Sequence, residues 1–487
     1  MVRDTAAIAW APTNGTVYTV GTQPAGGPAP MRVAFNGTGN SVAQAAVDGL
    51  ANGTQYFYRV YPRINATTNY ITDAGMTQAI SQVNVTPASG NLAWSYMTTG
   101  GSTLNAPISG YGRVYVGSNG SKMVALNSST GVELATPVIT NGAVQSYLSW
   151  FPVSGGSNEA VVVGDQTGRL TSINGVTGAR NWTVQLPVDA SGFIQAAATV
   201  QLRDGYDLSG PCDGGTFRST YTTDIIYIAS RMNGRTNNTV WAVRADTGAI
   251  VWTYTPSASM DRATGQPYVD YCQNRLWVST GRGSTGLQKS VWVINTITGA
   301  EVTSFNNVGV QTTSAPTLSY DATTFWVGDA AGNVYAFDAT AAPPTLKYSQ
   351  LLTGGPAITG FVWEDWWQLG RLYIPVVAAG GAGVWCVQDT GAGFTNCADW
   401  TAANPRIPVA AGTLAQPMVT DTAIFFPGSD GKIYQISTTD GTLVGTPFTV
   451  ESGTALGGVS TEDLTQLYVG TSTARSYRIN LNGGNLP

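Results

Sequence analysis

A short pattern that recurs eight times along most of the chain limits the folds that the chain can adopt. In each copy, apolar or aromatic residues alternate with other residues, as in Val240-Trp241-Ala242-Val243, and most copies end in a turn such as Asp246-Thr247-Gly248. Alternation with a period of two indicates a β-strand with one packed face. The turn supplies left-handed backbone positions, with which the chain reverses as a hairpin. The copies occupy residues 123–131, 170–178, 240–248, 291–299, 334–338, 384–391, 433–441 and 476–483.

A second strand-like segment precedes most copies, as in Arg371-Leu372-Tyr373-Ile374. The copies are spaced by roughly 40 to 70 residues, which is the spacing of β-propeller blades. The sequence therefore predicts an all-β fold, an eight-bladed β-propeller with four short strands in each blade. The preceding segments occupy residues 113–117, 225–228, 275–278, 325–328, 371–374 and 466–470.

The way the ring closes is also predictable. The eighth copy ends at Asn482-Gly483, and no outer strand follows it. Residues 90–96 (Gly-Asn-Leu-Ala-Trp-Ser-Tyr) match the outer-strand sequence of residues 248–254 (Gly-Ala-Ile-Val-Trp-Thr-Tyr). We therefore expect residues 91–97 to complete the last blade, which removes an open sheet edge and joins the first repeat to the last.

Two copies carry a tryptophan at a fixed distance from the turn glycine. Thr177-Gly178-x-x-x-Trp182 and Thr247-Gly248-x-x-x-Trp252 resemble the repeat of pyrroloquinoline-quinone (PQQ) type propellers. The resemblance covers residues from about 90 to the end and implies a propeller domain over 89–487. It also implies that the tryptophan docks between neighbouring blades.

Residues 1–88 do not follow the repeat and are predicted to form a separate small β-sandwich. Ile8 to Pro12 resembles the tryptophan-bearing strand of fibronectin type III domains, and Leu50 to Val60 resembles that family's corner and following strand, with Tyr56 as the corner tyrosine. The last strand is expected from Ala79 to Val85. The usual first strand is missing before Ile8, so either it lies outside the numbered sequence or the sheet has an open edge that accepts a strand from another molecule.

Charge and hydropathy exclude several classes of protein. The net charge is −5 and charged residues make up only 10%, whereas a nucleic-acid-binding protein presents a basic face. No apolar stretch of about 18 residues predicts a membrane span. No signal peptide is visible at Met1-Val2-Arg3-Asp4, although one removed before the numbering begins would leave no trace.

Cysteines and glycosylation sequons indicate export. The preferred pairing of the four cysteines is Cys386 with Cys397, across a turn-rich segment, and Cys212 with Cys272; four free thiols are the alternative. Together with the sequons, they predict an extracellular or cell-surface protein, glycosylated at some of these sites. The Asn-x-Ser/Thr sequons begin at Asn14, Asn36, Asn52, Asn65, Asn84, Asn119, Asn127, Asn181 and Asn237.

Catalytic chemistry finds little support in the sequence. The chain has no histidine, which excludes Ser–His–Asp and Cys–His catalysis and histidine-ligated metals. Within the resembling family, PQQ-dependent dehydrogenases carry a disulfide between adjacent cysteines, a Ca²⁺ held by Glu, Asn and Asp, and a catalytic Asp. No adjacent cysteines occur here, and no matching set of ligands can be placed. We therefore expect a protein that is not an enzyme and has no cofactor.

Two segments are candidate sites. The loop from Asp204 through Asp207 to Asp213 is acidic and is either a weak Ca²⁺ site or a solvated loop pinned by a disulfide. The second segment is expected at the turn between the first two strands of a blade. Its aromatic rings and carboxylates suit a sugar or a protein partner, or else the rings cover a blade junction. It consists of Trp363, Glu364, Asp365, Trp366 and Trp367.

Three functions follow from these observations. The first is a non-enzymatic extracellular structural protein, in which the propeller is a rigid block and residues 1–88 connect it to neighbouring copies or to other surface proteins, as in a filament or surface layer. The second is a surface or periplasmic module that binds glycan or protein; PQQ-type propellers also serve as scaffolds in outer-membrane assembly, which is an analogy of fold. The third, and least supported, is a PQQ-dependent dehydrogenase.

Overall fold

The computed structural model describes most of the eight repeats and a few short segments before them. The described residues are 2–4, 23–24, 32–33, 56–59, 78–81, 92–98, 101, 106–135, 137–154, 158–187, 197–204, 215–230, 238–256, 260–281, 289–305, 314–352, 357–358, 360–365, 368–378, 381–400, 406–407, 417–482, 484 and 486.

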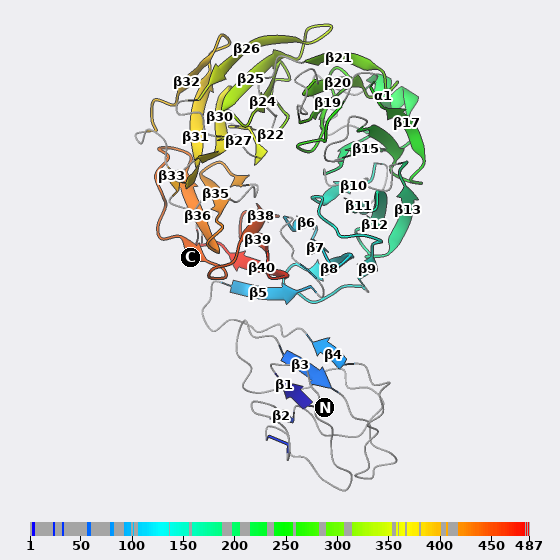
Figure 1. Ribbon diagram of the computed structural model, residues 1–487, viewed down its shortest axis with the longest axis vertical. Helices are drawn as coiled ribbons and strands as arrows, with labels where there is room; N and C mark the ends of the chain where they lie inside the picture. The colour runs from blue at the N-terminus through cyan, green and yellow to red at the C-terminus, as the bar shows by residue number, and fades with distance from the viewer. Residues whose placement is uncertain are drawn as a thin grey trace.

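Eight antiparallel sheets stand around a ring and form the blades of a propeller (Figure 1). Strands are called A to D from the centre outwards. Blade 1 contains β6 (Ile108–Gly110), β7 (Arg113–Ser118), β8 (Lys122–Asn127) and β9 (Val138–Ile139). Blade 2 contains β10 (Ser149–Pro152), β11 (Glu159–Gly164), β12 (Arg169–Asn174) and β13 (Arg180–Gln185). Blade 3 contains β14 (Thr199–Gln201), β15 (Ile225–Ala229), β16 (Val240–Arg244) and β17 (Ile250–Tyr254), with α1 (Gly215–Thr220) between β14 and β15. Blade 4 contains β18 (Tyr268–Asp270), β19 (Arg275–Ser279), β20 (Val291–Asn295) and β21 (Glu301–Phe305).

The other half of the ring has the same plan. Blade 5 contains β23 (Thr317–Leu318), β24 (Thr324–Gly328), β25 (Asn333–Asp338) and β26 (Thr345–Leu351). Blade 6 contains β27 (Ala357–Ile358), β29 (Trp363–Glu364), β30 (Arg371–Ala378), β31 (Gly381–Asp389), β32 (Phe394–Asn396) and β33 (Arg406–Ile407). Blade 7 contains β34 (Met418–Val419), β35 (Ala423–Pro427), β36 (Lys432–Ser437) and β37 (Phe448–Thr449). Blade 8 contains β38 (Leu456–Ser460), β39 (Gln466–Thr471), β40 (Arg475–Asn480) and β5 (Leu92–Met97), and β22 (Ser314–Ala315) pairs with β28 (Gly360–Phe361) between blades. The all-β, eight-bladed propeller predicted from the repeat is confirmed.

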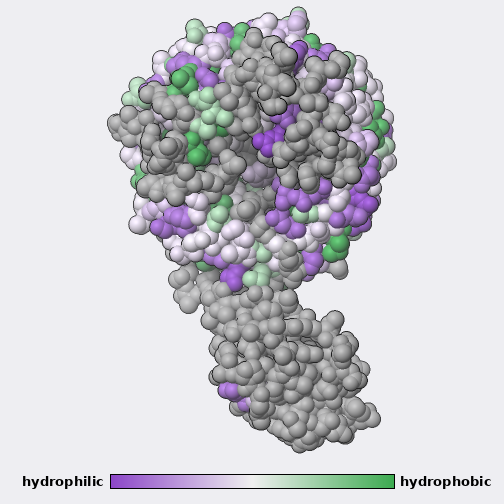
Figure 2. Space-filling view, viewed as in Figure 1, coloured by the Kyte–Doolittle hydropathy of each residue, from purple (hydrophilic) through white to green (hydrophobic). Residues whose placement is uncertain are grey.

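Burial explains why the B and C strands carry the strongest apolar pattern. The B strands β11, β15, β19, β24, β35 and β39 are buried at every position, and their side chains pack against the neighbouring blades. Several D strands face solvent and mix exposed with half-buried residues, as β13, β17 and β26 do. The face in Figure 2 accordingly shows hydrophobic residues in small, separate groups among its coloured parts.

The ring closes through β5. This strand pairs antiparallel with β40, and the register joins Met97 to Arg475 and Trp94 to Arg478. Figure 1 shows β5 as the outermost strand of the blade that contains the C-terminal strands β38 to β40. This pairing is the closure predicted for residues 91–97, because the last blade obtains from the start of the ring the outer strand that it lacks.

Tryptophans on outer strands dock on the next blade, as the resemblance implied. The Trp94 side chain is buried, its Nε1 donates to the Ser128 carbonyl over 2.7 Å, and its indole covers Gly131. A Cβ atom on Gly131 would lie 2.7 Å from the Trp94 ring, and the Gly131 φ of +68° favours glycine in any case. The same arrangement pairs Trp182 with Gly248, Trp252 with Gly299 and Trp400 with Gly441.

In the N-terminal region, four short strands form one antiparallel sheet in the order β2-β1-β3-β4: β1 (Val2–Asp4), β2 (Arg32–Val33), β3 (Tyr56–Arg59) and β4 (Gln78–Ser81). β3 and β4 overlap the strands predicted within 50–60 and 79–85. The expectation that no strand precedes Ile8 is wrong, because Val2–Asp4 pairs with both β2 and β3. The tryptophan strand at 8–12 lies outside the described residues, so the fibronectin-like sandwich and the boundary between 88 and 89 stay predictions.

Over the residues that the structure describes, no helix has the length and apolar character needed to cross a membrane.

The docked tryptophan gives a matched pair of glycine substitutions. Gly131 and Gly391 both have a left-handed φ, +68° and +79°, but a Cβ on Gly391 would meet nothing within 4 Å. Gly391→Ala should therefore cost only the backbone strain, about 1 kcal/mol. Gly131→Ala should cost clearly more, because the methyl group displaces Trp94. Equilibrium urea unfolding of both variants measures the difference, and equal losses would contradict the docking role of Trp94.

Candidate functional site

The turn with the unusual tryptophans lies at the junction of blades 5, 6 and 7. Trp363 is half-buried and packs against the core shared by blades 6 and 7, so for this residue the structure favours the blade-junction interpretation. Glu364 Oε2 accepts the Tyr320 N–H of blade 5 over 2.5 Å, and Oε1 accepts the Gly370 N–H over 2.7 Å. Burial raises the pKa of Glu364 above its ordinary value. Trp366 and Trp367 lie outside the described residues, so a stacking role for them stays a prediction.

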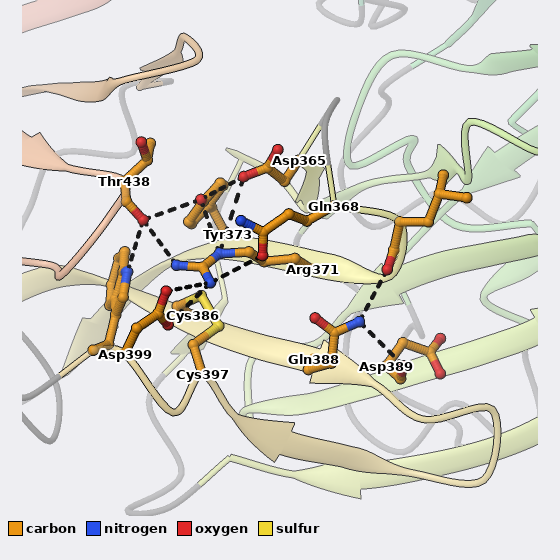
Figure 3. Close-up of a disulfide and its surroundings, with 12 residues drawn as sticks. Asp365, Gln368, Arg371, Tyr373, Cys386, Gln388, Asp389, Cys397, Asp399 and Thr438 are labelled. Atoms are coloured by element: carbon orange, nitrogen blue, oxygen red, sulfur yellow. Dashed lines mark hydrogen bonds and ion pairs between the residues drawn. A yellow bond between two sulfur atoms is a disulfide. The ribbon is translucent and has the colours of Figure 1, made fainter.

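Asp365 belongs to a polar cluster centred on Arg371 (Figure 3). The Arg371 side chain is 5% exposed, and its guanidinium is surrounded by acceptors. Nη1 donates to both Asp399 oxygens at 3.0 and 2.9 Å, and Nη2 donates to the Thr438 carbonyl of blade 7 at 2.8 Å. The Tyr373 hydroxyl donates to Asp365 Oδ2 over 2.8 Å. Burial is the main reason why the pKa of Tyr373 is raised, so the phenol stays protonated and can donate.

The disulfide between Cys386 and Cys397 stands beside this cluster (Figure 3). It joins β31 to the segment that follows β32, where the Cα atoms of the two cysteines are 5.5 Å apart. That segment carries Asp399, which binds Arg371, and Trp400, whose Nε1 donates to the Thr438 carbonyl over 3.0 Å. The disulfide thus fixes the segment that places Trp400 against blade 7 and Asp399 against Arg371, which itself donates to blade 7.

The Thr438 carbonyl has counterparts around the ring. In six blades, the carbonyl of the first residue after strand C accepts hydrogen bonds from side chains of the preceding blade. These acceptors are Ser128 (from Trp94 and Arg478), Gly175 (from Tyr115), Ala245 (from Trp182), Thr296 (from Trp252 and Tyr227), Ala339 (from Arg275) and Thr438 (from Trp400, Arg371 and Tyr373). In blade 6 the carboxylate of Asp389, the last residue of strand C, accepts from Trp326 and Tyr348 instead.

The donor role of these side chains was not predicted from the sequence, although the sequence contains a recurring pattern that marks some of them. Several B strands begin with arginine followed at the second position by an aromatic residue: Arg113-x-Tyr115, Arg275-x-Trp277 and Arg371-x-Tyr373. Taken as a strand pattern alone, these residues predict only burial. Their recurrence at the same end of the strand marks the side chains that reach the next blade.

The acidic loop gives little support for a Ca²⁺ site. Asp204 is described and pairs with Arg203 at 2.7 Å, whereas Asp207 and Asp213 lie outside the described residues. Within the described ranges, no three His, Cys, Asp or Glu side chains are grouped so that they could hold a metal ion. The Ca²⁺ site stays a prediction.

The described inner strands offer no cationic partner for a PQQ cofactor. That quinone carries several carboxylates and needs cationic partners. The described A strands contain no lysine or arginine, and Asp270 is the acidic residue among β6, β10, β14, β18, β23, β27, β34 and β38. We derive no step through the quinone.

The remaining predicted sites have mixed outcomes. Cys272 is in a disulfide, while Cys212, its expected partner, lies outside the described residues. Asn119 and Asn181 are exposed at sequons in blades 1 and 2. Asn127 is half-buried, and its Oδ1 accepts the N–H groups of the following turn. The other sequons, at Asn14, Asn36, Asn52, Asn65, Asn84 and Asn237, lie outside the described residues.

One buried carboxylate was not anticipated from the sequence. Asp270 is fully buried at the end of β18, where its Oδ1 accepts the N–H groups of Cys272 and Gln273. In the described part of the chain, its Oδ2 has no hydrogen-bond partner. Burial raises the pKa of Asp270 to about 6. The carboxyl group is therefore a structural element whose charge disfavours folding.

Comparison with known proteins places the repeat but not the function. Residues 77–206 match the family described as outer membrane protein assembly factor BamB. This is a minor part of the chain, and it supports the PQQ-type character of the repeat. The comparison with curated proteins found no match.

Solved structures show the same fold at low sequence identity. BamB from Moraxella catarrhalis is 15% identical, with a TM-score of 0.53 over 80% of this chain and 97% of that one. The computationally designed Ika8 protein is 15% identical, with a TM-score of 0.55 over 80% of this chain and 100% of that one. Quinohemoprotein alcohol dehydrogenase from Comamonas testosteroni is 13% identical, with a TM-score of 0.57 over 80% of this chain and 76% of that one. Because an assembly factor, a designed protein and an enzyme share the fold, the fold alone does not decide the function.

Replacing Arg371 tests the blade 6–7 cluster. Arg371→Met keeps an unbranched side chain but leaves acceptors of the buried cluster unsatisfied, and it should destabilise the protein by about 3–5 kcal/mol. Arg244→Met is the matched control, because Arg244 pairs with Asp246 at 2.7 Å and the two side chains are 35% and 43% exposed. The control should lose less than about 1 kcal/mol in chemical denaturation. Similar losses in both variants would show that the cluster does not hold the blades together.

Asp270 gives a pH dependence with a definite sign. Because its folded pKa of about 6 is above the ordinary value of 3.8, its ionisation opposes folding, and stability falls as pH rises from about 4 to about 6. Asp270→Asn should remove this loss, so its stability relative to wild type should rise by about 3 kcal/mol between pH 4 and pH 7.

Asp321 is the control of opposite sign. Burial raises its pKa, but hydrogen bonds from Ser319 and Thr323 outweigh burial and hold the pKa below its ordinary value. Asp321→Asn should therefore lose stability relative to wild type as pH rises from acid to neutral. A pH-independent difference between Asp270→Asn and wild type, measured by denaturant unfolding at each pH, would contradict the assignment for Asp270.

Proposed function

We propose that this chain is a non-catalytic structural protein that acts outside the cytoplasm. The propeller is its rigid block, and the predicted domain at residues 1–88 is the connector to neighbouring copies. The observation that carries the proposal is the use of polar side chains at the blade junctions. Arg371, Tyr373, Asp365 and Glu364, which a binding or catalytic site would need free, bind one another and the backbone of adjacent blades.

Two further observations support this function. The Cys386–Cys397 disulfide suits an oxidising compartment outside the cytoplasm. The part of the inner strands that the structure describes contains no lysine or arginine to bind a quinone cofactor, and this favours the structural function over the dehydrogenase alternative. The pairing of β5 with β40 closes the ring and the disulfide cross-links blade 6, and both suit a rigid block.

A scaffold that binds other proteins is the second candidate. The match of residues 77–206 to the family of an outer-membrane assembly factor favours it. The two candidates differ in the behaviour of the purified protein. A structural subunit assembles with further copies of itself, whereas a scaffold stays monomeric until its partner protein is added. Glycan recognition by the Trp363–Trp367 segment would be a version of this second function.

Imaging of the purified full-length protein tests the proposal. We expect electron microscopy at increasing protein concentration to show filaments or sheets built from ring-shaped subunits. Dispersed monomers at high concentration, in the absence of any partner, would favour the scaffold. Incubation with PQQ and Ca²⁺ followed by desalting is the check on the third alternative, and a quinone absorbance band that stays with the protein would overturn the non-catalytic assignment.

A further inference from the structure

The two ends of the propeller differ in the segments that they contain. Because the four strands of a blade alternate in direction, the A–B and C–D turns lie together at one end of the ring, here called the turn end. The B–C turns and the connections from one blade to the next lie at the other end, here called the connection end. Any regular difference between these segments therefore becomes a difference between the two faces of the ring.

The turn end exposes carboxylates in most blades. Its exposed cations among the described residues are Arg180 and Lys347. Half-buried side chains add cations such as Arg113, Arg203 and Arg244, but also the carboxylates of Asp204, Asp338, Asp440 and Glu462, so acidic groups outnumber the cations that a partner would meet there. The exposed acidic residues in six of the blades are Glu133, Asp246, Glu301, Asp321, Asp421 and Asp463.

The same end also exposes large apolar side chains. Tyr111, Tyr320, Leu369 and Leu464 lie in A–B turns and are 70%, 62%, 55% and 44% exposed. Exposed apolar side chains next to charged ones are typical of a protein-binding surface. A partner of this face would offer cations together with apolar surface.

The connection end has the opposite bias. Cations begin four of the C strands, at Lys122, Arg169, Lys432 and Arg475, and Lys289 stands just before a fifth; all five residues are half-buried, so they reach the surface. The Lys432 side chain is 43% exposed, and its Nζ lies 3.8 Å from Asp430 Oδ2, so part of its charge is compensated.

The carboxylates of the connection end compensate only part of this charge. Asp165 and Asp329 are buried, and their oxygens accept backbone N–H groups of the B–C turns. Asp261, Asp430 and Glu451 are half-buried. The accessible charge among the described residues of this end is therefore mainly cationic.

We propose that the turn end of one copy binds the connection end of a second copy, so that the rings stack head to tail. The proposal rests on the proposed function and adds to the connector at residues 1–88 a direct contact between the propellers of neighbouring copies. Contact between two different faces is heterologous, and repetition of it without closure generates an open filament. Charge complementarity between the faces steers and orients the association, and salt weakens it.

Charge reversal at each end tests this assignment. The turn-end variant carries Asp246→Lys and Asp421→Lys, and the connection-end variant carries Lys122→Glu and Lys432→Glu. Among the described residues, the Asp246 side chain binds half-buried Arg244 and the neighbouring Thr247, both within its own turn, so its loss should leave the fold intact. We expect each variant alone to raise the Kd of self-association at least about tenfold at about 0.02 M salt, by sedimentation velocity.

Mixing the two variants gives the decisive result. The turn-end variant has two lysines at its turn end and an unchanged connection end, whereas the connection-end variant has two glutamates at its connection end and an unchanged turn end. The new lysines can face the new glutamates in a mixture, so an equal mixture should regain assembly as an alternating stack. The control carries Thr253→Lys and Ser349→Lys, which introduce two lysines at exposed positions of the outer strands β17 and β26 without removing a carboxylate, and it should leave the Kd unchanged. Thermal unfolding of all variants checks the fold.

Each outcome decides for or against the stack. Head-to-tail stacking is overturned if both variants assemble as strongly as the wild type, or if their mixture stays dissociated. In either case the wild-type protein still assembles through other surfaces, so the proposed function stands. Equal weakening by the outer-strand control would show that net charge, and not the two ends, governs association. Absence of self-association by the wild-type protein at every salt concentration overturns both the stack and the structural function.

Discussion

The hydrogen bonds from one blade to a backbone carbonyl of the next blade are the interaction on which this ring depends. A carbonyl buried between two sheets loses its hydration and must find a donor. The repeat places such a carbonyl after strand C of most blades and a long donor on the preceding blade. Since the donors are indole, phenol and guanidinium groups, each also fills the space between sheets with apolar surface. One position therefore combines packing, polar satisfaction and register between blades.

Variation among the junctions shows how this constraint is met with different residues. Trp94 and Arg478 both reach Ser128, whereas Arg275 alone reaches Ala339. At the junction of blades 1 and 2, Ala135 occupies the place of the docked tryptophan against Gly178, and Tyr115 supplies the donor from the B strand instead. The acceptor is thus retained while the donor varies, which explains why the tryptophan motif is recognisable in only some of the copies.

Local patterns predicted the fold because each blade is built from short-range features. Alternation marked the buried strands, and glycine at a left-handed turn position marked the hairpins. The docking of Trp182 and Trp252 followed from their spacing to the turn.

The roles of Arg371 and Asp365 could not be predicted from the sequence, because both depend on contacts with the next blade or across a turn. An acidic, aromatic segment also suggests a binding surface equally well. The strand at Val2–Asp4 was missed because three residues are too few to show a period. The burial of Asp270 was also not predictable, since an Asp before a turn is usually solvated.

The pairing of β5 with β40 has a consequence for synthesis of the chain. Blade 8 combines residues 92–97 with residues 456–480, so its outer strand leaves the ribosome long before the three strands that it must join. During that interval β5 has no partner from its own blade, and its edge is available to other chains. Contacts so distant in sequence also form late. The ring is therefore expected to fold blade by blade and to acquire its resistance to proteolysis in one final step after translation.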